Sequence, residues 1–158
     1  MVVVSMDQST RCSGYAVFEN GQYVESGVID MNKSKLETDA RSFEMAKALW
    51  KVIKKYQPEH LVLEDVQNQA NTKTMIVLAR LAGMIIGYAE AHHVKVHILQ
   101  PSKWRAALKY AQGSKVKRGE LKKQSLEYVK ENLGLSLPED QAEAICQGIA
   151  AHKILDFE

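Results

Sequence analysis

Hydrophobic and polar positions divide the chain into short apolar runs, one hairpin pattern and several helical repeats. The valine triplet at the N-terminus is β-branched and ends close to Asp7, which predicts a short buried strand. Residues 14–19 and 22–29 flank Asn20 and Gly21, the dipeptide that supplies the two positive φ angles of a type I′ turn. The first three strands are therefore predicted to form an antiparallel meander.

Helical and strand-like patterns alternate in the rest of the chain. Thr38 is the expected N-cap of an amphipathic helix that begins at Arg41 and stops before Pro58. Residues 60–64 (HLVLE) predict a fourth strand buried on both faces, and residues 94–99 predict a fifth. Further helices are expected at 72–91, from Pro101, at 121–132 and from Pro138, with a flexible basic loop at 112–119.

This order of elements indicates a mixed α/β fold in one domain spanning residues 1–158. Strands joined by helical crossovers pair in parallel, so we expect a five-stranded mixed sheet, three antiparallel strands then two parallel, flanked by helices. In such sheets ligands collect at the carboxyl ends of the strands. Asp7 and Glu64 both stand at predicted strand ends, which makes this edge the expected site.

The predicted helix at 72–91 is apolar on more than one face. Gly83 and Gly87 stand four residues apart and leave a flat stripe where another backbone can approach. A helix of this kind needs cover on two sides, and the sheet supplies one. A second subunit of a homodimer is our candidate for the other, and a helix sunk in the monomer's own core is the alternative.

Charge is distributed unevenly, although the formal net charge of the 158 residues is only +2. Residues 103–123 carry a local charge of +7, which predicts a polyanionic partner. Cys12 and Cys146 lack metal-site spacing and are expected to be reduced thiols in a cytoplasmic protein. No apolar stretch runs uninterrupted for about eighteen residues, so no membrane span is expected.

Four acids are the candidate catalytic and metal-binding residues: Asp7, Glu64, Asp140 and Glu143. Asp140 and Glu143 stand three apart on a helix and project from one face. Converging carboxylates repel one another unless a cation lies between them, and oxygen ligands suit Mg²⁺ or Mn²⁺. Two such ions about 4 Å apart can clamp the attacking and leaving oxygens in phosphodiester hydrolysis, with Asp7 as the expected bridge.

Each acid also has a purely structural explanation. Asp7 is a common residue type at a strand-end turn, and Asp140 with Glu143 suits the positive end of a helix dipole. Glu64 is harder to explain in this way, because glutamate is depleted in strands and costly to bury unpaired. If the acids do converge, they should raise one another's pKa in the absence of metal.

Three segments resemble the RuvC-type Holliday junction resolvases of the ribonuclease H-like superfamily: MDQSTRCSGYAVFE, LVLEDV and PEDQAEAICQGIAAHK. The short chain resembles the phage-type members. The resemblance implies a ribonuclease H-like fold and a homodimer that nicks branched DNA, with the four acids binding two divalent ions in each active site. It also implies phosphate contacts from the basic stretch, expected at Lys103, Arg105, Lys115, Lys117, Arg118, Lys122 and Lys123.

The chain departs from the family pattern at two positions. Glu143 stands where aspartate is common, which affects metal preference, and Gln67 stands where bacterial resolvases often carry a junction-wedging aromatic residue. A polar amide cannot stack in the same way, so we expect cleavage of forks and three-way junctions as well as Holliday junctions. These expectations all follow from the resemblance.

Other functions on the same fold remain open at this point. An RNA-processing nuclease of the superfamily would use the same acids and the same basic stretch. A non-catalytic nucleic-acid-binding module gains nothing from acids beside phosphate, which disfavours it. A sugar-kinase or actin-like ATPase half is disfavoured because the chain is short and lacks a glycine-rich phosphate loop with lysine, so no nucleotide cofactor is expected.

Overall fold

A five-stranded mixed sheet forms the centre of the computed structural model, which describes residues 1–157. The strands lie in the order β3-β2-β1-β4-β5, with β1 antiparallel to β2 and parallel to β4. Their bounds are β1 Val2–Asp7, β2 Cys12–Glu19, β3 Gln22–Asp30, β4 His60–Glu64 and β5 Lys95–Leu99. The predicted five-stranded mixed sheet is confirmed, and β1 is its central strand.

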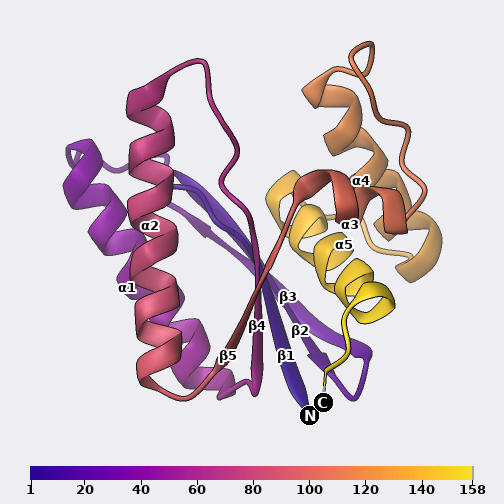
Figure 1. Ribbon diagram of the computed structural model, residues 1–158, viewed down its shortest axis with the longest axis horizontal. Helices are drawn as coiled ribbons and strands as arrows, with labels where there is room; N and C mark the ends of the chain where they lie inside the picture. The colour runs from indigo at the N-terminus through magenta and orange to yellow at the C-terminus, as the bar shows by residue number, and fades with distance from the viewer. Residues whose placement is uncertain (158) are drawn as a thin grey trace.

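Helices cover both faces of the sheet (Figure 1). Two pack on one face, α1 (Thr38–Tyr56) and α2 (Thr72–Ala91). Three lie on the other face: α3 (Pro101–Ala107), α4 (Arg118–Leu133) and α5 (Glu139–Ile154). β1 and β4 end on the same edge of the sheet, where α1 and α2 both begin.

Local sequence explains most of these elements. Asn20 and Gly21 adopt φ angles of 49° and 79°, as a type I′ hairpin requires. β4 has four consecutive buried residues before Glu64, as expected for a strand covered on both faces. Along β1, Val3 and Ser5 face α5, whereas Val4 and Met6 face α1.

Three predicted helix starts need correction. The first helix begins at Thr38, with Glu37 as its N-cap, because the Arg41 N–H already donates to the Glu37 carbonyl (2.8 Å). α4 begins at Arg118, inside the predicted loop, since the Glu120 side chain accepts from the Lys117 N–H (3.2 Å) and caps the helix there. The last helix begins at Glu139, after Pro138 as its N-cap.

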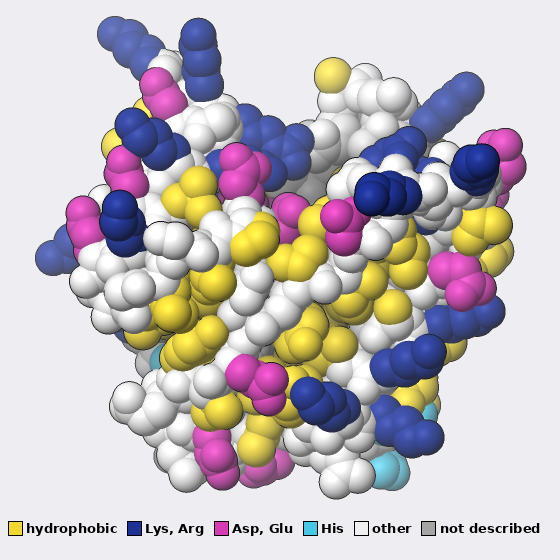
Figure 2. Space-filling model, turned by 180° about the vertical axis from the view of Figure 1, so that it is seen from behind, with side chains coloured by type: hydrophobic (Ala, Val, Ile, Leu, Met, Phe, Trp, Pro, Cys, Tyr) yellow, Lys and Arg dark blue, Asp and Glu magenta, His cyan; other side chains and the backbone are white. Residues whose placement is uncertain are grey.

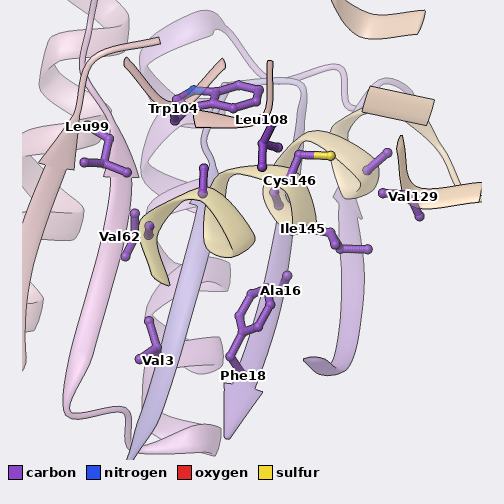
Figure 3. Packing of buried hydrophobic residues seen from close by; sticks show 14 of the residues in the cluster. Val3, Ala16, Phe18, Val62, Leu99, Trp104, Leu108, Val129, Ile145 and Cys146 are labelled. Carbon is purple, nitrogen blue, oxygen red and sulfur yellow. The ribbon is translucent and has the colours of Figure 1, made fainter. Parts of the chain in front are cut away.

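The core on the α5 side includes Val3 and Val62 from the sheet, Trp104 from α3 and Ile145 from α5 (Figure 3). Trp104 is almost fully buried. The core on the other side joins Leu61 and Leu63 of β4 to α1 and α2. Each face of the sheet therefore has its own hydrophobic layer.

Small residues let α5 approach the sheet closely. Ser5 Oγ donates to the Ala144 carbonyl (2.6 Å), so β1 and α5 are joined by a buried hydrogen bond. A Cβ at Gly14 would overlap the Asp140 carbonyl, and one at Gly148 would overlap the Phe18 ring. Both glycines are needed for this approach, which holds the start of α5 beside the end of β1.

α2 buries only part of its apolar surface. Leu81, Ala82, Ile85 and Ala89 are its buried residues. Gly83 is exposed, and an added Cβ there would have nothing within 4 Å. This exposure disfavours the alternative that the helix is sunk in the monomer's own core. Within residues 1–157, α2 alone has the length and apolar composition of a membrane span, a test that core helices also pass.

Candidate active site

The four candidate acids line one cleft of about 220 Å³ at the carboxyl ends of β1 and β4. Four basic side chains line the same cleft: Arg11, Arg105, Arg118 and Lys122. Figure 2 shows acidic groups in and beside the hollow at the top of its view, with basic side chains on both sides. The sequence-based prediction that the acids converge is borne out in this geometry.

The acids form a group of three with a fourth at its side. Ligand oxygens of Asp7, Asp140 and Glu143 all lie within 4.8 Å of one another. Glu64 is held by the α3 side: the Trp104 indole Nε1–H donates to Glu64 Oε2 (2.7 Å). Arg105 Nη2 lies 3.9 Å from the same oxygen and 3.7 Å from Glu143 Oε1. Arg105 thus stands between Glu64 and the group of three.

Two strands and one helix set the backbone position of each of the four acids. Asp7 ends the central strand, Glu64 ends its parallel neighbour, and Asp140 and Glu143 lie in the first turns of α5. The buried Gln147 amide lies between these elements, and in the orientation that satisfies both of its groups its nitrogen donates to the Met6 carbonyl (3.1 Å) and its oxygen accepts from the Glu64 N–H (2.8 Å). α5 is thereby tied to the ends of both strands that carry acids.

Burial is the first cause of the carboxyl pKa shifts in the cleft. It raises the pKa of Asp7 well above the usual range, and the charges of Glu143, Glu64 and Asp140 raise it further. Burial also raises the pKa of Glu143, against the lowering effect of Lys122. It raises the pKa of Glu64, although the Trp104 hydrogen bond and Arg105 act in the opposite direction. Mutual repulsion, the cause expected from the sequence, is secondary.

Lys122 and Arg105 compensate part of this negative charge. Lys122 Nζ lies 3.0 Å from Glu139 Oε2 and 3.9 Å from Asp140 Oδ1. Burial lowers the pKa of Lys122, but the hydrogen bond to Glu139 and the nearby carboxylates outweigh it, so the net shift is upward. Lys122 therefore stays protonated at neutral pH.

The donor set suits a hard divalent cation. Three carboxylates offer oxygens close together, and the half-buried Asp7 lacks a cation of its own within ion-pairing distance among residues 1–157. Burial and the hydrogen bond with Asp140 raise the pKa of the nearby Cys12 thiol to about 12, so this thiol is protonated in the metal-free protein. An oxygen-ligated Mg²⁺ or Mn²⁺ fits these residues.

Comparison with known proteins places the chain in a family. The family model for the crossover junction endodeoxyribonuclease RuvC matches residues 3–150. The chain belongs to the RuvC family. It is 28% identical over 153 residues to RuvC of Fusobacterium nucleatum (92% of this chain, 76% of the relative). It is also 28% identical over 155 residues to RuvC of Dictyoglomus turgidum (92% of each chain).

Solved structures share the fold of this RuvC-family chain. RuvC of Thermus thermophilus in complex with a Holliday junction substrate has a TM-score of 0.76 at 16% identity, covering 96% of this chain and 92% of that one. The Fowlpox virus resolvase in complex with Holliday junction DNA has a TM-score of 0.66 at 18% identity, covering 97% of both. The predicted family is confirmed, and the phage-type subdivision stays a prediction.

Three of the seven predicted DNA-binding residues line the cleft of this RuvC-family chain: Arg105, Arg118 and Lys122. Lys103 lines a different hollow, beside Asp65 and Ile154. The other three are exposed around the start of α4: Lys115, Lys117 and Lys123, the last of which pairs with Glu127 (3.7 Å). The basic stretch therefore divides into residues at the acids and residues at the rim.

Sequence reasoning missed three residues of the site. The hydrogen bond of Trp104 to Glu64 has no signal in the sequence pattern. Gln147 was not singled out, although a glutamine among the apolar residues of α5 is a buried polar group that needs partners. Arg11 follows Asp7 by four residues, and that proximity was the available signal.

We predict that Trp104 positions Glu64 for metal binding in this RuvC-family site. Trp104→Phe keeps an aromatic core residue but removes the indole N–H, and should weaken Mn²⁺ affinity in calorimetry by about 10- to 100-fold. The matched control is Trp50→Phe, because the Trp50 indole donates to the Met84 carbonyl (3.1 Å) in the opposite core. Equal Mn²⁺ affinities for both variants would contradict the role.

We predict that Asp7 destabilises the metal-free protein at neutral pH. Its folded-state pKa is raised above the unfolded value, so its stability contribution is present below the ordinary carboxyl pKa and is lost as pH rises through the raised value. Asp7→Asn should raise the metal-free Tm at pH 7.5, by roughly 2–4 °C for each kcal/mol released, and have little effect near pH 4. Mn²⁺ should raise the Tm of the wild type only; an unchanged Tm in every condition would contradict this.

Proposed function

We propose that this protein is a divalent-metal-dependent, structure-specific endonuclease that nicks phosphodiester bonds in branched DNA. One observation carries the proposal: carboxylates of Asp7, Asp140 and Glu143 gather at the end of the central strand in a cleft that basic side chains also line. Membership of a family named for crossover junction endodeoxyribonuclease activity supports it. So do structural neighbours solved with Holliday junction DNA. Recombination, repair or phage DNA processing are the settings we infer.

Each side chain has a proposed task. Asp7, Asp140, Glu143 and Glu64 would hold Mg²⁺ or Mn²⁺, and we propose two ions in each site. When bound, such ions lower the pKa of the attacking water and neutralise charge on the phosphate. Arg105 and Lys122 lie beside the acids and neutralise the remaining charge of the scissile phosphate. Arg118 and the rim lysines contact flanking phosphates and add affinity without reading sequence.

Substrate breadth follows from the loop after β4. Gln67 is exposed there and its amide Nε2 donates to the Asp65 carbonyl (3.3 Å), so it offers hydrogen bonds and no stacking ring. We propose that Holliday junctions, forks and three-way junctions are all cut. A cytoplasmic location follows from a DNA substrate in a bacterial cell or a phage-infected one. An RNA substrate is the competing possibility, since phosphate contacts alone do not distinguish the two nucleic acids.

Digestion of a labelled panel tests this function: four-way, three-way, forked and linear DNA, and duplex RNA, each with Mg²⁺ or Mn²⁺. We expect metal-dependent nicking of the branched DNAs. Asp7→Asn and Asp140→Asn should lower the cutting rate by roughly a thousandfold or more, because each ligand supports an effect of several kcal/mol. Junction binding should stay intact or strengthen, since negative charge near phosphate is removed.

Glu44→Gln is the control for this panel, because Glu44 is an exposed acid on α1 that pairs with Lys47 away from the cleft. It should cut like the wild type. Cutting of RNA alone would overturn the DNA assignment. An Asp7→Asn protein that cuts at the normal rate would remove Asp7 from the mechanism.

We further propose that α2 is the interface of a homodimer. Ile76 is 42% exposed, and with Ala79, Gly83 and Gly87 it forms a stripe at helical spacing on the side away from Ile85. An added Cβ at either glycine would meet nothing within 4 Å, so a second backbone has room to approach. A symmetric substrate such as a four-way junction also suits a two-fold enzyme.

Sedimentation at micromolar concentration tests the dimer. The wild type should sediment as a dimer, and Gly83→Arg should sediment as a monomer because it places a large charged side chain in the stripe. Gly119→Arg is the matched control: Gly119 is also a helical glycine with open space around it, on α4. It should remain dimeric. A monomeric wild type would refute the interface.

A further inference from the structure

A second cleft of about 320 Å³ adjoins the catalytic cleft and shares Arg11 with it. It lies between the starts of α1 and α2, on the side of the sheet away from α5. Its polar lining consists of three cations and three hydroxyl side chains: Arg11, Arg41, Lys73, Thr10, Thr38 and Thr74. No acid lines it, so its composition is that of an anion site. We call it the α1–α2 pocket.

The three cations of the α1–α2 pocket lack acidic partners. Within residues 1–157, no carboxylate lies within 4.0 Å of the charged nitrogens of Arg11, Arg41 or Lys73. The acid in the first turn of α1, Asp39, pairs instead with Arg80 (3.5 Å). This differs from the catalytic cleft, where Arg105 and Lys122 both lie beside carboxylates.

Arg41 is the strongest sign that a ligand belongs in this pocket. Arg41 is only 6% exposed, and its Nε has no hydrogen-bond partner among residues 1–157. Nη1 donates to the Leu36 carbonyl (3.2 Å), which orients the guanidinium without neutralising it. A buried guanidinium with an unsatisfied N–H is costly unless an anion completes its contacts.

Two helix starts add to the positive potential. Thr38 is the first residue of α1, and Thr74 lies in the first turn of α2. Helices of 19 and 20 residues present partial positive charge and free N–H groups at these ends. The Asn71 side chain already accepts from the N–H groups of Lys73 and Thr74, so α1 supplies the free backbone donors.

We infer that the α1–α2 pocket binds a backbone phosphate of the DNA strand whose scissile phosphate lies at the acids. The inference rests on the proposed nuclease function and adds a contact outside the predicted basic stretch. Arg41 fits the geometry of two phosphate oxygens, Lys73 and Arg11 supply charge, and the threonine hydroxyls supply neutral donors. Because Arg11 lines both clefts, one strand can occupy both.

Binding of DNA with single neutral linkages tests the inference. A methylphosphonate replaces each phosphate of a four-way junction in turn, and affinity is measured by fluorescence anisotropy in the uncleaving Asp7→Asn background. At one position flanking the cleavage site the neutral linkage should weaken binding by roughly tenfold. In the double variant Arg11→Ala/Lys73→Ala, the same neutral linkage should weaken binding almost no further. That result would show that these two residues and that phosphate are energetically coupled.

The double variant should bind the unmodified junction about a hundredfold more weakly, and its slope of log K against log salt should be smaller by about 2. Both replaced residues are exposed, so folding should persist. Lys51→Ala/Lys153→Ala is the matched control, since it removes two exposed lysines outside both clefts. It should keep the wild-type slope. Arg41→Lys keeps the charge but loses the fork, and should weaken binding by roughly tenfold.

The outcomes separate this inference from the proposed function. If junctions are bound and cut, and the double variant binds them with the same affinity and salt slope as its lysine control, only the assignment of the pocket is wrong. Failure of the wild type to bind or cut any branched DNA would overturn the nuclease function as well. Binding of inorganic phosphate is the last measurement. If phosphate binds the wild type and not the double variant while both bind the junction equally well, the pocket holds free anions and its assignment to DNA is wrong.

Discussion

The close approach of α5 to the end of β1 is the contact on which the site depends. Asp7 comes from the central strand, whereas Asp140 and Glu143 come from a helix more than a hundred residues later. Their oxygens lie within 4.8 Å because the helix backbone rests directly on the strands. The Ser5 hydroxyl bonded to the Ala144 carbonyl sets that spacing, and the missing side chain at Gly14 permits it. Packing at this contact therefore controls the charge density of the cleft.

In the metal-free protein, the clustered acids lie in an unfavourable environment. Burial keeps the pKa of Asp7 and Glu143 high, so the folded chain holds carboxyl groups in an environment that disfavours their charged form. Arg105 and Lys122 relieve part of this cost at distances between 3.7 and 3.9 Å from the clustered acids, too long for strong hydrogen bonds. The carboxylates of Asp7, Asp140 and Glu143 would hold a divalent cation, whose charge would balance the acids that Arg105 and Lys122 balance in its absence. The charge of the clustered acids would thus be better balanced with a bound divalent cation than without one.

Sequence patterns predicted the sheet, because strand length, the Asn20-Gly21 turn and helical crossovers are local or topological features. They also predicted which acids converge, since two lie at strand ends and two on one helix face. They did not predict that Glu64 stands apart, because that separation is set by a side chain from α3, Trp104. The three helix starts were displaced because backbone and side-chain caps act over only a few residues, where periodicity carries little information.

The cations of the two clefts differ in their partners. This difference bears on the order in which metal and DNA bind. In the catalytic cleft, Lys122 and Arg105 lie beside acids, which under the proposed function compete with phosphate for these two cations. In the α1–α2 pocket, Arg41 has no competing carboxylate within 4.0 Å among residues 1–157. The phosphate contact that we propose for Arg41 therefore does not depend on metal. On this proposal, DNA binds through the pocket whether or not the acids hold a metal ion, and the side chains that supply affinity there differ from those that support cutting.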